Sequence, residues 1–204
     1  MSSAREEILK KLSTSVHPVP EPPDFEQHVF PPVIFPLEQT FKTQLEAING
    51  KVFIFQSKAE LYNSLKTDLL QFRIENIFCS EPEIMKNLVQ FEIGFNEYAS
   101  VVKNMEVGIT GCEFLVAQTG SAMVSSAQRG GRQMNIFPPL HIIIAYRNQL
   151  VTTLEEAYSM IQQKYTDGLP SQIALVTGPS RTADIEKTLV LGAHGPRELW
   201  VMIA

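Results

Sequence analysis

A run of small and hydroxyl-bearing residues follows an apolar segment near the C-terminus, and ligand chemistry is expected there first. Residues 173–176 (IALV) predict a strand that runs into residues 177–186 (TGPSRTADIE). Backbone N–H groups at such a strand end can hold a phosphate or a carboxylate, and Arg181 adds a charge and a fork of donors. The candidate ligand-binding residues of this segment are Gly178, Ser180, Arg181, Thr182, Asp184 and Glu186. The alternative is a capped loop whose charged side chains face solvent.

Two other segments combine polar side chains with glycine. Residues 117–121 (AQTGS) make Thr119, Gly120 and Ser121 candidates, because the glycine lets a ligand or another strand approach the backbone closely. The alternative for this segment is a hairpin turn between two strands. His194 lies in a glycine-rich turn, where its side chain can titrate and act as an acid, a base or a ligand contact. The alternative for His194 is a hydrogen bond within its own turn.

The elements that must position these residues follow an alternating pattern of helices and short apolar strands. Helices are expected at 37–48, 57–70 and 153–165, with a further short one opening at Glu81-Pro82. Strands are expected at 51–55, 77–79, 98–102, 114–117, 122–125, 141–146, 173–176 and 200–203. This alternation predicts an α/β domain with a mostly parallel sheet covered on both faces. Ligands bind beyond the carboxyl ends of such strands, so the segments around Thr119 and Ser180 are expected to meet at one sheet edge.

The first 36 residues differ from the rest, so the predicted domains are 1–36 and 37–204. Residues 2–13 predict a short helix with a narrow apolar stripe, expected to dock weakly or to reach a partner. Residues 17–36 are rich in proline and predict an extended strap. The strap is expected to be pinned on the domain by its large apolar side chains, which are Phe25, Phe30, Val33, Ile34 and Phe35. A Gly/Arg-rich loop is expected at 128–133.

Composition excludes several classes of function. Lys and Arg number 17 against 22 Asp and Glu, and a net charge of -5 does not fit a nucleic-acid binder. Two cysteines and four scattered histidines do not suffice for an iron–sulfur cluster or a structural zinc site, so no metal and no cofactor are expected in this chain. No apolar run approaches the ~20 residues that span a bilayer. With no apolar signal segment at the start, a cytoplasmic protein is expected.

Three stretches resemble a known family. Residues 177–196, 108–121 and 137–143 are similar to the sequence signatures of the lactate-utilization protein C family, the LUD-domain proteins. The resemblance implies a three-layer α/β/α fold like that of ribose-5-phosphate isomerase, glucosamine-6-phosphate deaminase and CoA transferases. It also implies a component of bacterial L-lactate oxidation to pyruvate that acts beside iron–sulfur subunits and carries no cluster itself. The ligand implied is a small anion such as a phosphate, a carboxylate or a CoA-like molecule.

One departure from the family pattern bears on activity. Related sequences commonly carry an acidic residue where this chain has Gln118, and CoA transferases of this fold use a glutamate nucleophile. An amide cannot form an acyl anhydride, and Glu113 lies in another part of the motif. Two functions therefore stay open: an accessory, ligand-binding subunit of a lactate oxidation system, or a free-standing protein acting on a phosphosugar, a CoA ester or a folate.

Overall fold

The structure, a computed structural model, describes residues 3–15, 21–22, 33–97, 104–182, 190–191 and 194–204. It divides into two units, Met1–Pro31 and Pro32–Ala204. In the first unit α1 (Ala4–Thr14) begins with a reciprocal cap: the N–H of Glu6 donates to the Ser3 hydroxyl at 3.3 Å, and the Glu6 carboxylate accepts from the Ser3 N–H at 2.9 Å. The predicted N-terminal helix is therefore confirmed.

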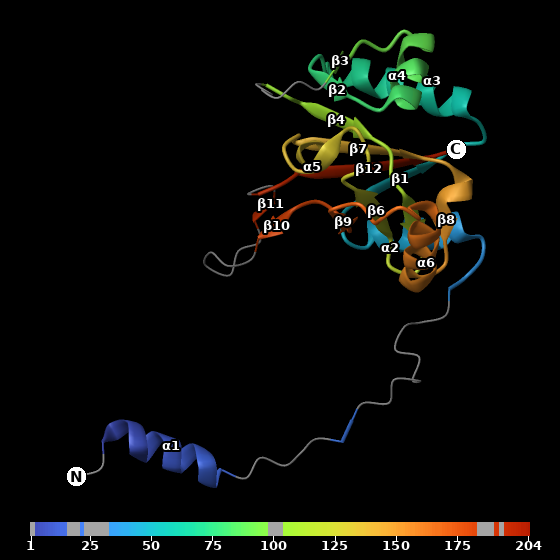
Figure 1. The fold of residues 1–204 in the computed structure, drawn as a ribbon. Helices are drawn as coiled ribbons and strands as arrows, with labels where there is room; N and C mark the ends of the chain where they lie inside the picture. The colour runs from blue at the N-terminus through green and yellow to red at the C-terminus, as the bar shows by residue number, and fades with distance from the viewer. Residues whose placement is uncertain (1–2, 16–20, 23–32, 98–103, 183–189, 192–193) are drawn as a thin grey trace. The chain divides into compact units, whose positions relative to one another are not determined.

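The second unit is built on a six-stranded sheet in which every neighbouring pair is parallel (Figure 1). The strands, in spatial order, are β1 (Lys51–Ile54), β12 (Glu198–Ile203), β7 (Leu140–Ala145), β4 (Val107–Thr110), β2 (Ile77–Cys79) and β3 (Asn96–Glu97). The central strands β4 and β7 are buried along their whole length, as expected for strands covered on both faces. The α/β class and the mostly parallel central sheet are confirmed.

Two helices cover one face of this sheet. They are α3 (Lys58–Gln71), which begins where the Ser57 hydroxyl accepts from the Glu60 N–H at 3.2 Å, and α4 (Pro82–Gln90), which has proline at its first position. Their fully buried side chains, among them Leu65 and Leu88, join one apolar core with the sheet residues Ile109 and Ile142. This core lies between the helical layer of α3 and α4 and the parallel sheet.

The other face is covered by α2 (Leu37–Glu46) and by a second, smaller sheet. Its strands, in spatial order, are β8 (Leu150–Val151), β5 (Phe114–Val116), β6 (Ser121–Ser125) and β9 (Ile173–Val176). The β5–β6 and β6–β9 pairs are antiparallel, and β5–β8 is parallel. Helix α6 (Leu154–Lys164) packs Ala157 and Ile161 against this small sheet. The layered α/β arrangement is confirmed, with the small sheet as a component that the strand pattern did not separate from the large one.

Some expectations for the loops are wrong. The segment expected to be a Gly/Arg-rich loop contains the short helix α5 (Gly131–Met134). Ile34 and Phe35, expected to be buried as part of the strap, are each 73% exposed. Of the three described apolar residues of the strap, only Val33 packs against the core before α2 begins. The other two apolar strap residues, Phe25 and Phe30, and the strand expected at 98–102 lie outside the described residues.

Short elements complete the described chain. The 3₁₀ helix η1 (Arg147–Gln149) follows β7, and β10 (Arg181–Thr182) pairs antiparallel with β11 (Val190–Leu191). In the described part of the chain, none of the helices is both long enough and apolar enough to cross a membrane.

Candidate functional site

The two segments predicted to meet at a sheet edge do lie side by side. Antiparallel pairing of β6 with β9 places Ala122 opposite Val176, so the hairpin turn before β6 lies beside the end of β9. The hydroxyl oxygens of Ser121 and Thr177 are 2.7 Å apart, and those of Thr119 and Ser121 are 2.8 Å apart. The edge belongs to the small sheet, however, and not to the parallel sheet.

Helix α2 fills the space that the glycines of this edge leave. Gly120 has φ +63, and a Cβ there would lie 2.5 Å from the backbone nitrogen of Leu45. Gly178 has φ +91, and a Cβ there would lie 3.1 Å from the carbonyl oxygen of Ile48. The close approach that these glycines permit is therefore made by the end of α2 and by the turn that follows it. The β5–β6 connection is a hairpin turn, the alternative considered from sequence.

The C-terminal turn with His194 joins the same region. The N–H of Ser180 donates to the carbonyl of Pro196 at 2.8 Å, and a Cβ on Gly195 would lie 3.0 Å from the Cβ of Ser180. The side chains of Arg181 and His194 are exposed. The structure thus places Thr119, Gly120 and Ser121 beside the end of β9, and Gly178, Ser180 and the backbone of Arg181–Thr182 follow from that end to the His194 turn. Asp184 and Glu186 lie outside the described residues.

A second group of polar residues lies where β2 and β4 of the parallel sheet end. Glu81 follows β2, and its Oε1 accepts from the N–H of Gly111, which follows β4, at 2.7 Å. A Cβ on Gly111 would lie 2.8 Å from Oε2 of Glu81, so the carboxylate occupies the place that a side chain would need. Burial raises the pKa of Glu81, and the charge of Glu113 raises it further. The hydrogen bond from the Gly111 N–H acts in the opposite direction.

Glu113 is the buried centre of this group. It is 3% exposed, and three side chains donate to its carboxylate: Ser125 at 2.5 Å, Lys164 at 2.7 Å and Tyr165 at 2.8 Å. Burial alone would raise the pKa of Glu113, but the hydrogen bonds from Lys164, Ser125 and Tyr165 outweigh it and lower the pKa. Lys164 ends α6 and Tyr165 follows it, so the end of α6 is held against Glu113, directly before β5.

Gln128 links the two carboxylates. Its Oε1 accepts from the Ser125 N–H at 3.0 Å, and its side chain also acts on the Glu81 carboxyl, whose pKa it lowers. A cavity of ≈ 450 Å³ lies along α4 and β3, and its lining includes Pro82 and Arg129. The pKa values of the two carboxyl groups are moved in opposite directions. At a pH between these two values Glu81 holds a proton and Glu113 does not, and acid–base chemistry requires such a difference.

Sequence reasoning missed most of this second group. From the sequence, Glu113 is set aside as a nucleophile because it lies in another part of the motif. Lys164 and Tyr165 are placed only at the end of a predicted helix. One signal was available for Glu81: it follows a predicted buried strand, and the rule on carboxyl ends of parallel strands applied to it as well as to Ser180.

The described residues contain no group of three or more His, Cys, Asp or Glu side chains placed to hold a metal ion. Both cysteines are buried and free, and burial raises the pKa of the Cys79 thiol to about 12. Cys79 belongs to the core between the parallel sheet and α3 and α4, whereas Cys112 belongs to the core on the opposite face.

These features define an α/β domain with polar groups at the ends of two sheets, and comparison with known proteins agrees. A family model described as the LUD domain matches residues 37–204, and the chain belongs to this family. A crystal structure of a DUF162 family protein from Deinococcus radiodurans has a similar fold, with a TM-score of 0.60 and 19% identity over 82% of this chain and 95% of that one.

Relatives in sequence fall into two kinds. Lactate utilization protein C of Bacillus licheniformis is 39% identical over 92 residues, which cover 44% of this chain and 38% of that protein. The protein of the same name from Bacillus subtilis is 38% identical over the same shares of the two chains. An uncharacterised protein of Neisseria meningitidis serogroup B is 26% identical over 98% of this chain and 93% of its own length.

Proposed function

We propose that this chain is a ligand-binding component of an L-lactate utilization system and that it carries no iron–sulfur cluster itself. The observation that carries the proposal is the LUD-domain match over residues 37–204, together with relatives named lactate utilization protein C. The partners in this proposal are iron–sulfur subunits that oxidise lactate to pyruvate in the cytoplasm. The thiols support the division of labour, because an iron–sulfur cluster usually takes four cysteine ligands and this chain has only Cys79 and Cys112, both of them buried.

The ligand in this proposal is a small anion, such as a carboxylate, a phosphate or a CoA-like molecule. Arg181 supports this ligand class because its side chain is exposed beside Ser180 and the His194 turn. A guanidinium provides a fork of donors that fits a carboxylate or a phosphate.

Growth of the host tests the proposed system. Deletion of the gene is expected to abolish growth on L-lactate as sole carbon source and to leave growth on pyruvate unchanged, because pyruvate enters metabolism after the step concerned. The intact gene should restore growth, and iron–sulfur proteins should co-purify with the tagged chain under anaerobic conditions. Unchanged growth on L-lactate contradicts the proposal and favours a free-standing protein acting on a phosphosugar, a CoA ester or a folate.

Calorimetry on the purified chain tests the ligand class separately. We expect one of four probes, L-lactate, pyruvate, inorganic phosphate or CoA, to bind. Arg181→Ala is then expected to weaken binding about tenfold or more, since a hydrogen bond to a charged group contributes about 1.5–3 kcal/mol. Arg5→Ala, which removes the same side chain from α1, serves as the matched control. Equal affinities in the two variants would remove Arg181 from the site.

A further inference from the structure

Helix α4 has two faces that carry apolar residues. Ile84 and Leu88 are buried in the core between α4 and the parallel sheet. The other face follows the same spacing of three and four residues and is formed by Pro82, Met85, Lys86 and Val89. Together with Phe95, Glu97 and Arg129, these residues line the cavity of ≈ 450 Å³, here called the α4-edge hollow. Its volume lies within the range of small-molecule pockets, roughly 300–1,000 Å³.

The α4-edge hollow has a charged end and an apolar end. Pro82 opens α4 shortly after the carboxyl end of β2, and Glu97 is the last residue of β3. Arg129 follows Gln128, whose side chain is hydrogen-bonded to Glu81, the neighbour of Pro82. Val89 lies seven residues after Pro82, about 10 Å further along α4 at 1.5 Å per residue. The charges therefore gather at the carboxyl ends of β2 and β3, where α/β folds bind small molecules, and the apolar lining extends away from them.

The charges of the α4-edge hollow leave an excess of one positive charge. Lys86 and Arg129 supply two cations, and Glu97 supplies one carboxylate. Among the described residues none of these three side chains forms an ion pair, so their charges are not already matched. An anion with a single negative charge balances the hollow, and a guanidinium provides a fork of donors for a carboxylate. A phosphate with two negative charges would leave an excess of negative charge beside Glu97.

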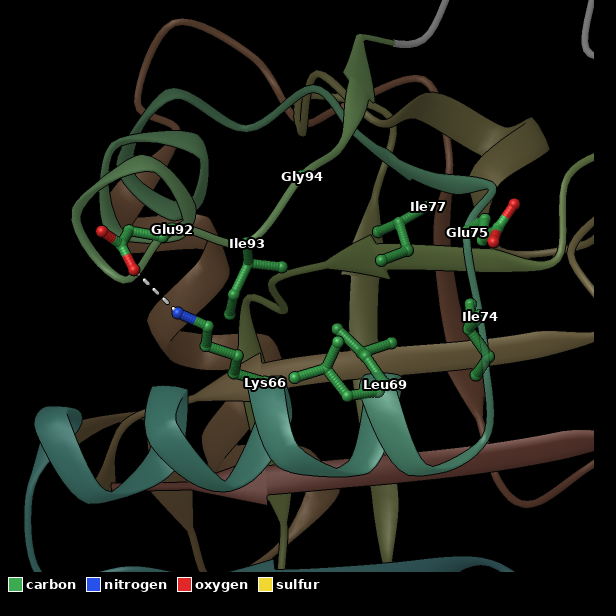
Figure 2. A pocket seen from close by; sticks show the side chains of 9 residues that line it. Lys66, Leu69, Ile74, Glu75, Ile77, Glu92, Ile93 and Gly94 are labelled. Carbon is green, nitrogen blue, oxygen red and sulfur yellow. Dashed lines mark hydrogen bonds and ion pairs between the residues drawn. The ribbon is translucent and has the colours of Figure 1, made fainter.

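A second hollow, at the end of α3, has the opposite balance of charge. It has a volume of ≈ 290 Å³, and Figure 2 shows Leu69 and Ile77 among the apolar side chains around it. Lys66 pairs there with Glu92, with 3.0 Å between Nζ and Oε2, and Glu75 adds a second carboxylate. Its one cation is thus already paired, and its net negative charge would repel an anion. Of these two hollows, the α4-edge hollow is the one that suits an anion.

We propose that the α4-edge hollow binds a small amphipathic carboxylic acid. The carboxylate lies beside Arg129 and Lys86, and the apolar chain lies along α4 and covers Val89, which is 67% exposed. L-lactate and pyruvate have no chain long enough to reach from the charged end to Val89. The α4-edge hollow lies on the parallel sheet, whereas Arg181 follows β9 of the small sheet, so the two sites bind their ligands separately.

Calorimetry of the full chain with octanoate tests the site. We expect octanoate to bind, and acetate and octanol to bind about tenfold or more weakly, because acetate lacks the chain and octanol lacks the charge. Arg129→Gln is expected to weaken octanoate binding about tenfold, since it removes the charged donors. The matched control is Lys66→Gln, which removes a cation that already has a carboxylate partner. This control should bind octanoate as the unaltered chain does.

A second variant changes the apolar end and leaves the charges in place. Val89 is 67% exposed, so Val89→Gln is tolerated by the fold and should weaken octanoate binding severalfold. The melting temperatures of both variants by circular dichroism should stay close to that of the unaltered chain. Failure of octanoate to bind overturns the proposal, and so does binding that Arg129→Gln and Val89→Gln both leave intact. Arg181→Ala should leave octanoate binding unchanged, and if it alone weakened binding, octanoate would occupy the Arg181 site instead.

Discussion

The carboxylate of Glu81 accepts the N–H of Gly111 at 2.7 Å and thereby joins the loops that follow β2 and β4. The neighbouring carboxylate, Glu113, is held instead by three side-chain donors. The charge of Glu113 acts on Glu81 and helps to raise its pKa, whereas the pKa of Glu113 itself is lowered. This contrast gives opposite effects of pH on the two corresponding variants.

Glu81→Gln and Glu113→Gln are expected to change in relative stability with pH in opposite directions. The folded-state pKa of Glu81 is raised above 4.5, so the native chain loses stability as pH rises through this pKa, and the Glu81→Gln variant gains relative to it. The folded-state pKa of Glu113 is lowered below 4.5, so the native chain gains stability as pH rises up to 4.5. The Glu113→Gln variant lacks this gain, so its free energy of unfolding decreases relative to that of the native chain.

Urea unfolding at a series of pH values from acid to neutral measures both trends. The unaltered chain is the common reference, so contributions from all other groups cancel in the differences. If the stability of both variants followed the same trend with pH, the pKa values of Glu81 and Glu113 would not be shifted in opposite directions. The acid–base interpretation of this group would then fail.

Local pattern predicted most of the elements but not the division into two sheets. The strands at residues 51–55, 77–79 and 141–146 stand out because each is a short apolar run between turn or capping signals. The pairing of β6 with β9 joins residues about fifty positions apart, and nothing in the sequence of either strand states its partner. Both strands are apolar, as the strands of the parallel sheet are, so the sequence does not distinguish the two sheets.

The candidate site shows the same limit. The hydroxyl edge at Ser121 and Thr177 was predictable, because each residue adjoins a strand and a glycine turn. The convergence of Lys164 on Glu113 was not, since it depends on how α6 packs over the small sheet. The exposure of Phe35 has a similar cause: an aromatic side chain among prolines predicts burial only if a groove is there to receive it.

A buried histidine is expected to make stability depend on pH between 4 and 6.5. The Thr110 hydroxyl is 3.1 Å from the Gly111 carbonyl oxygen, to which it can donate, and 2.8 Å from His141 Nε2, with which it shares a second hydrogen bond. Among the described residues His141 Nδ1 has no hydrogen-bond partner, and burial lowers the pKa of His141 to about 4, so the ring is neutral near pH 7. In this window the unfolded chain binds a proton that the folded chain does not, so stability falls as pH falls from 6.5 to 4, by up to about 3 kcal/mol.

His141→Gln separates this effect from the carboxyl groups. Glutamine keeps a donor near the position of Nε2 and has no charge change, so the variant should lose less stability between pH 6.5 and pH 4 than the unaltered chain. Thermal melts at the two pH values, compared between the two proteins, measure the difference. Equal losses in both proteins would mean that His141 is protonated in the folded state without cost.

The approach of α2 to the hairpin turn is expected to make Gly120→Ala strongly destabilising. Gly120 has φ +63, which costs an L-residue about 1–2 kcal/mol, and the added methyl would lie 2.5 Å from the nitrogen of Leu45 and 2.9 Å from the carbonyl carbon of Gln44. These contacts are with backbone, which cannot rotate away, so the total loss should exceed about 2 kcal/mol. Gly94→Ala is the matched control: a Cβ there meets no atom within 4 Å, and its effect should stay within about 0.5 kcal/mol. Denaturant midpoints measure both variants. A Gly120→Ala chain as stable as the control would show that α2 does not pack on the turn, and the hydroxyl edge beside it would then be open to a ligand.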